Sequence, residues 1–459
     1  MHPLVVIEEI DIESIAVLEP ENDSPVAADS HGPEGRQRAF ERMQAIAGKV
    51  ERLGRLGGVK GRQNTPELVP QCRSDPAWII VFVQPLEAPM AEAPDHTRLY
   101  SDKCRLSTGS AGGGLKACAP KRYAGRVAWT KILVRGTNWL GDAVMSLPAL
   151  RALRQRQPEA RITVLARGWV ADLYRREPSV DEVLVEPQGW IALRKQRFDA
   201  AILFPNSFRT ALDAWMAGIP RRIGYDRDRR GFLLTDPIQP PKPGETPPHE
   251  RFYYLELLRR AGILDELPPA APIVLHGAEE ARQAGLALFE QMGMKGPVVG
   301  VSPGAQNSRA KQWLPERFVD SSARVAAALG GGVAIFGSAS EGALCQGMAE
   351  TLRRAGVQVL SLAGETTLAQ FIELAAACRV FLTNDAGAMH VASALGVPTV
   401  AIFGPTDFVA TAPAGPVSSI VRAGVHCSPC MLRDCPIDHR CMTGVTAERV
   451  AATALELVK

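Results

Sequence analysis

Three short segments place charged residues beside glycine at points where an apolar run gives way to a helical pattern. The first is Arg135-Gly-Thr-Asn-Trp-Leu-Gly-Asp142, and its carboxylate falls in the first turn of the expected helix. A carboxylate at that position often serves as a partner for the helix dipole. In a cleft it could instead deprotonate an acceptor hydroxyl. Residue type and spacing leave both roles open for Asp142.

The same loop argues against two common kinds of nucleotide site. It lacks the Gly-x-Gly-x-x-Gly spacing of a dinucleotide site, and it lacks the Gly-Lys-Ser/Thr of a P-loop. A dehydrogenase and a P-loop enzyme are therefore not indicated.

The second segment, Ser302-Pro-Gly-Ala-Gln-Asn-Ser-Arg-Ala-Lys-Gln-Trp313, carries two bases, Arg309 and Lys311. It follows an apolar strand-like run, and open α/β sheets bind ligands at the carboxyl ends of their strands. The two cations could neutralise a pyrophosphate and stabilise it as a leaving group. A solvated basic loop is the alternative interpretation.

The third segment, Asn384-Asp-Ala-Gly-Ala-Met-His390, opens a helix that is rich in small residues. Small residues let a ligand approach the backbone, and the free N–H groups of a helix N-terminus suit phosphate. Asp385 could orient the loop or bind a sugar hydroxyl. His390 is interpreted as functional because of its context, although an isolated histidine would more often be a packed core residue.

Two further clusters stand out. Five arginines fall within residues 221–230, a density that suits a polyanionic acceptor but also fits a solvated surface loop. Four thiols, Cys427, Cys430, Cys435 and Cys441, allow a structural zinc site or an iron–sulfur cluster, with reduced or disulfide-bonded cysteines as the alternatives. Cys345 and Cys378 are expected in the core.

These segments are embedded in a strand–helix alternation that begins near Thr130 and predicts parallel sheets covered on both faces. The strands expected in a first series are 131–134, 161–166, 181–185 and 199–204. Those expected in a second series are 297–302, 332–336, 357–361, 379–383 and 399–403. A Pro-rich stretch at 236–243 suggests a hinge between the two halves. We therefore expect two doubly wound domains, at 129–275 and 276–459, that face each other across a cleft.

Residues 1–128 lack this alternation and carry acidic, Pro-rich and Gly-rich patches. We expect a largely disordered extension with one helix near 37–56 and one strand at 78–83. The net charge of +3 gives no argument for nucleic-acid binding. Because the sequence has neither a long apolar stretch nor the basic start of a signal peptide, we expect a cytoplasmic protein.

Taken together, the motifs resemble the lipopolysaccharide heptosyltransferases of glycosyltransferase family 9, and in particular the type II branch. The resemblance covers roughly residues 130–459 and rests on Lys131–Leu150, Ser302-Pro-Gly-Ala, Leu362-Ala-Gly-Glu-Thr366, Thr383–His390 and Phe403-Gly-Pro-Thr406. It implies a GT-B fold with the acceptor in the N-terminal domain and ADP-heptose in the C-terminal one. The reaction implied is inverting transfer of L-glycero-D-manno-heptose from ADP-heptose onto the first heptose of the lipopolysaccharide inner core. The acceptor would be a lipid A–Kdo–heptose core at the inner leaflet, which makes the enzyme peripheral to the inner membrane.

The resemblance also assigns roles. Asp142 matches the family's proposed base, and no cofactor is required for catalysis. The expected donor-binding residues are Lys311, Glu341, Thr366, Asp385, Gly387, Met389 and His390. The expected acceptor-binding residues are Arg135, Asn138, Arg221 and Arg222. One departure is Asp-Ala-Gly where Asp-Ser-Gly or Asp-Thr-Gly is usual, because the alanine removes a hydroxyl. The alternatives are a family 9 transferase with another acceptor, a nucleotide-sugar epimerase, and a non-catalytic module with the same fold.

Overall fold

The computed structural model describes residues 68–70, 80–82, 128–306 and 308–459. Strands β1 (Leu68–Pro70) and β2 (Ile80–Phe82) pair antiparallel within a unit that spans residues 1–114. β2 falls inside the strand expected at 78–83. The helix expected near 37–56 and the disorder expected across the rest of the extension lie outside the described residues. The following description concerns the second unit, from Leu115 to Lys459.

The first half of this unit is built on a six-stranded parallel sheet in the order β5-β4-β3-β6-β7-β8. Its strands are β3 (Lys131–Arg135), β4 (Arg161–Ala166), β5 (Glu182–Val185), β6 (Ala200–Leu203), β7 (Arg221–Tyr225) and β8 (Asp236–Ile238). Its helices are α2 (Leu140–Arg156), α3 (Gly168–Arg175), α4 (Trp190–Gln196), α5 (Phe208–Met216) and α6 (Arg251–Arg260).

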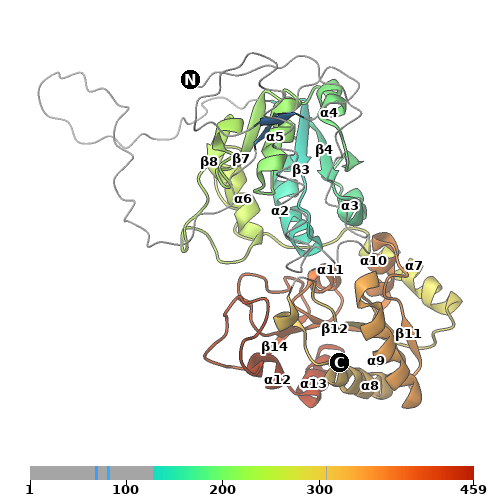
Figure 1. Cartoon of the computed structure of the whole chain (residues 1–459). Helices are drawn as coiled ribbons and strands as arrows, with labels where there is room; N and C mark the ends of the chain where they lie inside the picture. The colour runs from blue at the N-terminus through green and yellow to red at the C-terminus, as the bar shows by residue number, and fades with distance from the viewer. Residues whose placement is uncertain (1–67, 71–79, 83–127, 307) are drawn as a thin grey trace, which may run out of the picture. The chain divides into compact units, whose positions relative to one another are not determined.

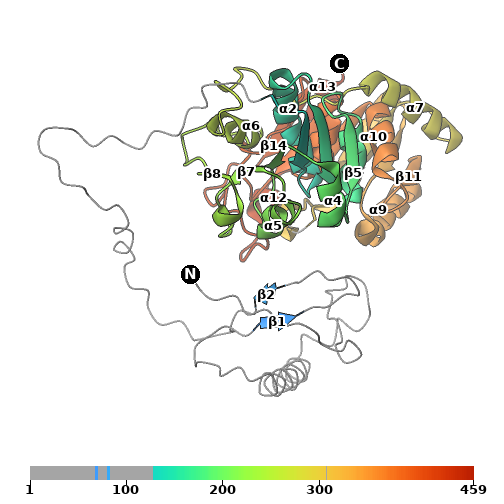
Figure 2. The ribbon, with the colours of Figure 1, turned by 90° about the horizontal axis from the view of Figure 1, so that it is seen from above.

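Alternation along the buried strands gives each face of this sheet its own core. On β3, Ile132 and Val134 pack with residues of α2, α3 and α6, whereas Leu133 packs with residues of α4 and α5. Figure 2 shows α4 and α5 on one side of the strands and α2 and α6 on the other. Strands buried on both faces read as continuous apolar runs, which is why the sequence pattern located most of them.

The second half repeats the plan with the sheet order β11-β10-β9-β12-β13-β14. Its strands are β9 (Val298–Ser302), β10 (Gly332–Ile335), β11 (Val359–Ser361), β12 (Val380–Asn384), β13 (Thr399–Phe403) and β14 (Ser418–Arg422). Its helices are α7 (Ala278–Gln291), α8 (Pro315–Leu329), α9 (Gly342–Arg354), α10 (Leu368–Ala377), α11 (Gly387–Ala394), α12 (Arg440–Thr443) and α13 (Ala447–Leu457), with short turns η4 (Arg309–Lys311) and η5 (Ala339–Glu341).

Both sheets have the doubly wound order in which the chain starts at a central strand and reverses direction once. The prediction of two α/β halves is confirmed. The segment interpreted as a basic loop contains strand β7, and the Pro-rich stretch begins with strand β8. Strand β14 was not expected either.

The two halves meet where α2 lies next to α11 (Figure 1), and one apolar core runs across this junction. Buried side chains from α2 and α6 belong to the same cluster as buried side chains from α10 and α11. In the described part of the chain, no helix combines the length and the apolar character needed to cross a bilayer.

Candidate active site

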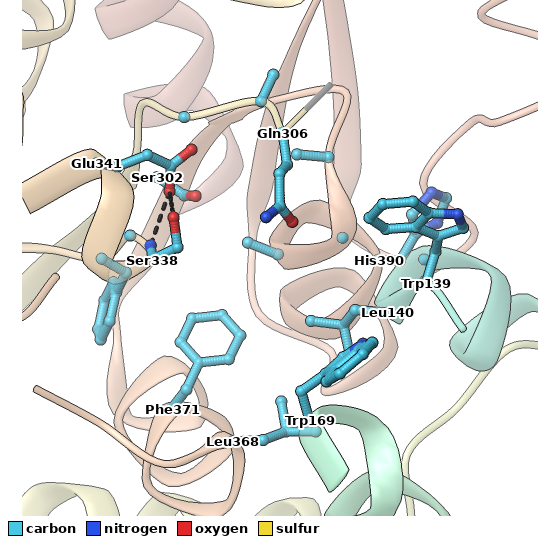
Figure 3. A pocket seen from close by; sticks show the side chains of 18 of the residues that line it. Trp139, Leu140, Trp169, Ser302, Gln306, Ser338, Glu341, Leu368, Phe371 and His390 are labelled. Atoms are coloured by element: carbon cyan, nitrogen blue, oxygen red, sulfur yellow. Dashed lines mark hydrogen bonds between the residues drawn. The ribbon is translucent and has the colours of Figure 1, made fainter. Parts of the chain in front are cut away.

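A cavity of about 790 Å³ lies between the halves, at the carboxyl ends of their strands. In open α/β sheets the ligand crevice forms where the strand order reverses, which here is between β3 and β6 and between β9 and β12. The first half lines the cavity with Trp139–Asp142 and with the start of α3. The second half contributes the segments after β9, β10, β11 and β12 (Figure 3).

The N-termini of α2 and α11 meet at this cavity from opposite halves. A Cβ placed on Gly387 would lie 2.9 Å from Leu140 Cβ, and one placed on Gly141 would lie 3.0 Å from His390 Cδ2. The N-cap residues, Trp139 and Ala386, make no side-chain capping hydrogen bond. The first N–H groups of both helices are therefore not satisfied by a cap, and both positive dipole ends are directed at one place.

Asp142 lies in the first turn of α2 and lines the cavity. Burial raises the pKa of its carboxyl group above the ordinary value, while nearby Lys311 and a hydrogen bond donated by the Tyr254 hydroxyl both lower it. The Tyr254 side chain is buried on α6. A carboxylate with a raised pKa is a better proton acceptor, and this environment therefore suits a general base.

Lys311 reaches the cavity from turn η4 and pairs with Asp385, which follows β12. Its Nζ donates to Asp385 Oδ2 over 2.9 Å and to the Asp385 carbonyl over 3.4 Å. The Asp385 side chain is 4% exposed, whereas that of Lys311 is 27% exposed. Asp385 thus fixes the ammonium group at the cavity wall, where it faces an incoming anion. The structure brings Asp142, Lys311, Asp385 and Gly387 together around one cavity.

Two other features position Lys311. The Asn384 amide donates to the Pro303 carbonyl over 2.6 Å and accepts from the Trp313 amide over 3.1 Å, which joins β12 to both ends of the loop that carries Lys311. From the other side, a His439 ring nitrogen bonds the Ala310 carbonyl over 2.7 Å, and the Ala310 amide donates to the Arg433 carbonyl. Neither of these supports could be predicted from the motifs.

His390 is 5% exposed and lines the cavity on α11. Burial lowers the pKa of its imidazole to about 4. The ring is therefore neutral near pH 7, so it can donate one hydrogen bond but adds no positive charge.

The end of the cavity formed by the second half combines a carboxylate with aromatic rings. Glu341 Oε2 accepts hydrogen bonds from the Ser338 amide over 2.7 Å and from its hydroxyl over 2.9 Å, which fixes the carboxylate at the cavity wall. Phe336 and Phe371 pack edge to face at 5.3 Å, and Thr366 lines the same region. Flat apolar walls beside a fixed carboxylate suit a nucleoside base and its ribose.

The structure places three of the predicted binding residues in structural roles. Met389 is fully buried and packs in a cluster with Ala401 and Phe403. Arg135 is 5% exposed and pairs with Glu186 at 2.5 Å, while its other nitrogen donates to the carbonyls of Gly136 and Leu165. The Asn138 carbonyl accepts from Trp169 Nε1, and its side chain accepts from Arg135. The side chains of Arg135 and Asn138 therefore stabilise the conformation of the loop between β3 and α2.

Arg221 and Arg222 lie at the wrong edge of the sheet for acceptor binding. They begin β7 and pair in register with Ala200 and Ala201, at the amino ends of the strands, whereas the cavity lies at the carboxyl ends. Arg221 forms an ion pair with Asp236 at 2.8 Å, and Arg222 donates to the carbonyls of Leu233 and Ile219. The acceptor interpretation of the arginine run is wrong, because the run contains an inner strand next to the edge strand β8, and in sequence its paired arginines resemble a basic loop.

The described residues do not support a metal centre at the four clustered cysteines. Among the residues that the structure describes, no group of three or more His, Cys, Asp or Glu side chains could hold a metal ion. Cys441 is buried in the core on α12, Cys430 is exposed, and the Cys435 sulfur accepts the His439 amide. The zinc expectation is not supported, although burial and the three other thiols, which lie nearby, together raise the pKa of Cys441. Cys345 and Cys378 are buried, as expected.

The sequence did not single out several residues that line the cavity, among them Trp139, Trp169, Phe336 and Phe371. Tyr254, which contacts Asp142, was missed as well. Tyr254 could not be found from spacing because it lies on another helix, 112 residues beyond Asp142 in the sequence. Trp139 offered one signal, since a large aromatic residue is unusual immediately before a helix.

Comparisons with known proteins agree with this arrangement. The family model described as glycosyltransferase family 9 (heptosyltransferase) matches residues 189–440. Lipopolysaccharide heptosyltransferase 2 of Escherichia coli K12 is 34% identical over 319 residues, which cover 64% of this chain and 88% of the relative. Lipooligosaccharide heptosyltransferase 2 of Haemophilus ducreyi is 31% identical over 312 residues, with coverage of 64% and 88%.

Solved structures give the same result. The structure of E. coli ADP-heptose lps heptosyltransferase II matches with a TM-score of 0.62 and 31% identity, covering 72% of this chain and 98% of that one. A glycosyltransferase family 9 protein from Veillonella parvula matches with a TM-score of 0.61, 21% identity and coverage of 73% and 99%, which supports the shared fold.

Proposed function

Because the chain belongs to glycosyltransferase family 9, the heptosyltransferase family, we propose that this glycosyltransferase moves a heptose from ADP-heptose onto the inner core of lipopolysaccharide. The acceptor is the first core heptose, which makes this the second heptosylation. The observation that carries the proposal is the cavity that holds Asp142 of one half opposite the Lys311–Asp385 pair of the other.

The second half, residues 276–459, is proposed to bind the donor. Its aromatic end with Glu341 and Thr366 suits adenosine. Lys311 and the N-terminus of α11 suit the diphosphate, since both present positive charge to one point. Gly387, which has no side chain, lets α2 pack against the N-terminus of α11 at this point. Neutral His390 adds a hydrogen-bond donor at the same place.

The first half, residues 129–275, is proposed to bind the acceptor. Asp142 takes the proton from the acceptor hydroxyl as its oxygen attacks the anomeric carbon of the donor sugar. The bond from that carbon to the phosphate oxygen breaks on the opposite side, so the configuration inverts and ADP leaves. The charge that develops on ADP is offset by Lys311 and by the N-termini of α2 and α11. Positive groups fixed by the fold thus supply leaving-group stabilisation without a cofactor.

The acceptor of this reaction carries a lipid A anchor, so the enzyme is proposed to act in the cytoplasm at the inner leaflet of the inner membrane. Cell fractionation tests the location. The protein should appear in the membrane fraction at low salt and move to the soluble fraction at high salt, because a peripheral protein is released as charges are screened.

A donor and acceptor screen on the purified full chain tests the reaction. ADP-heptose and other nucleotide sugars are each combined with core acceptors that carry no heptose or one heptose, and products are identified by mass spectrometry. The proposal predicts one added heptose on the mono-heptosylated acceptor with ADP-heptose as donor. Transfer to the heptose-free acceptor would favour another family 9 reaction. Conversion of a nucleotide sugar without an acceptor would favour an epimerase, and donor binding without turnover would favour a non-catalytic module.

A further inference from the structure

Trp139 departs from two local rules at once. Its side chain is 53% exposed, although burial of a ring of this size is strongly favourable. It also occupies the N-cap of α2 with extended backbone angles of −100° and 141° and makes no capping hydrogen bond. Ser, Thr, Asp and Asn are preferred there because their side chains satisfy a helix N–H group. Local rules are most often broken where function requires it.

The position of this ring points to the kind of ligand. Trp139 lines the cavity as the residue immediately before α2, and Asp142 lines the same cavity from the first turn of that helix. In Figure 3 the Trp139 ring lies next to His390, across the cavity from Phe371, Ser338 and Glu341. The end of the cavity suited to adenosine is therefore away from Trp139, whereas the proposed general base, Asp142, follows Trp139 by three residues and lines the same cavity.

A flat aromatic face binds a pyranose through the apolar C–H face of the sugar, while the hydroxyl groups at the edge of the ring find polar partners. A sugar whose hydroxyl reaches Asp142 would lie over Trp139. The second exposed ring of this wall, Trp169, is held by its hydrogen bond to the Asn138 carbonyl and by the Arg167 guanidinium 5.6 Å from the ring centroid. In Figure 3 it lies beside Leu368 of the second half. Trp169 thus borders the cavity on the side of α10. Trp139 is the exposed ring that precedes the proposed general base, Asp142.

We propose that Trp139 is the stacking platform for the acceptor sugar and orients its hydroxyl toward Asp142. This inference rests on the proposed heptosyl transfer and adds to it a specificity-determining contact on the acceptor side. The ring stabilises the binding of a pyranose through the C–H face of the sugar and does not stabilise the binding of the donor diphosphate.

The test compares Trp139→Ser, Trp139→Phe and Trp139→Leu in the full chain, with Trp215→Ala as the matched control. Trp215 is 48% exposed on α5 and is not among the residues that line the cavity. Initial rates are measured with each substrate varied in turn, and ADP and acceptor binding are measured by calorimetry. Trp139→Ser should raise the acceptor KM about tenfold or more, the change that loss of roughly 1.4 kcal/mol of stacking produces. The donor KM and the Kd of ADP should stay within about twofold.

Thermal unfolding separates binding from stability. Serine is a good N-cap, so the Tm of Trp139→Ser should equal or exceed that of the unmodified chain. The variant would then bind the acceptor more weakly without being less stable. Phenylalanine should recover most of the acceptor affinity because it keeps a flat ring, whereas leucine, which is apolar but not flat, should not. Trp215→Ala should change neither KM.

Three results would overturn the inference: a rise in the donor KM or in the Kd of ADP in place of the acceptor KM, equal behaviour of the Phe and Leu variants, or an equal effect of Trp215→Ala. If the unmodified chain transfers no heptose, the proposed function fails on its own. The acceptor Kd of Trp139→Ser against that of the unmodified chain then decides the role of the ring separately.

Discussion

Asp142 experiences opposing influences that together set its strength as a base. Burial raises its pKa, and the Tyr254 hydroxyl and the Lys311 ammonium lower it. The first effect makes the carboxylate a better proton acceptor, and the other two keep it ionised. A base must be ionised before it can accept a proton, so activity should fall as the pH drops through the Asp142 pKa.

Tyr254→Phe tests this balance. The Tyr254 hydroxyl donates to the ionised carboxylate and stabilises the charged form, so its removal raises the Asp142 pKa. The acid limb of the kcat/KM profile should therefore move to higher pH by about one unit, since one pKa unit corresponds to about 1.4 kcal/mol. A pH profile of the initial rate measures the shift. An acid limb that stays in place, or moves to lower pH, would contradict the assigned hydrogen bond.

Lys311→Gln tests the two roles of the Lys311 charge, which are stabilisation of the leaving group and stabilisation of the fold. The substitution removes the cation that faces the diphosphate, and kcat/KM should fall about 100-fold or more. It also leaves the buried Asp385 carboxylate without its ion partner, which should cost about 3 kcal/mol of unfolding free energy.

The double variant Lys311→Gln with Asp385→Asn should recover most of that stability in denaturant unfolding, because no unpaired charge is left buried. Its activity should stay low. Recovery of activity together with stability would show that Lys311 serves only the fold.

At the scale of single residues, the motifs drew attention to Asp142, Lys311, Asp385 and Gly387 because each lies between a strand and the end of the first turn of the following helix. The sequence could not predict that Arg135 forms an ion pair with Glu186, because the two residues are 51 positions apart in the sequence. Met389 shows the same limit. It lies between two cavity-lining residues of α11, but a helix turns about 100° per residue and directs its side chain into the core.

Among the elements, the meeting of α2 and α11 depends on two glycines without side chains. Gly387→Ala would place a Cβ 2.9 Å from Leu140 Cβ and 3.3 Å from the Gly141 amide nitrogen. Because neither atom is the end of a flexible side chain, the two helices must separate. We expect kcat to fall about tenfold, since small displacements of reacting groups are costly.

Gly347→Ala on α9 is the control, because a Cβ there meets no atom within 4 Å. It should leave kcat unchanged and stabilise the protein by roughly 0.5–1 kcal/mol, as alanine is the better helix former. Equal kinetics for the two alanine variants would contradict the close approach of the helices.

The loop that carries the cysteines acts on the site through turn η4. His439→Ala removes the bond to the Ala310 carbonyl, so Lys311 should become less well placed and the Kd of ADP should rise about fivefold. His439 has a positive φ of 55°, a conformation that asparagine tolerates well. His439→Asn is therefore the matched control for backbone strain, and calorimetry with ADP gives the comparison. An unchanged ADP affinity in His439→Ala would rule out this support.

Elements with continuous apolar runs could be predicted, and β4 and β13 coincide with the expected residues. β7 could not, because it begins with two arginines, and the sequence does not show that Asp236 and the carbonyls of Ile219 and Leu233 pair with them. β8 begins with Asp-Pro, which is typical of a turn, and its place at the sheet edge tolerates proline.

In the whole molecule, neither half holds a complete site. Asp142 comes from the first sheet and Lys311 from the second, and the cavity exists because the two carboxyl edges face each other. The sequence predicted two doubly wound halves and a cleft. It did not give the contact between α2 and α11, since that packing depends on the shape of both halves at once.

The most direct test of this account is mass spectrometry of the purified full chain incubated with ADP-heptose and a mono-heptosylated core acceptor, in parallel with Asp142→Asn. The account predicts one heptose gained by the acceptor for each ADP released. For Asp142→Asn it predicts unchanged ADP binding with turnover reduced at least about 100-fold, the scale of a lost general base. Transfer by Asp142→Asn at the rate of the unmodified chain, or no heptose gained by the acceptor in either reaction, would contradict it.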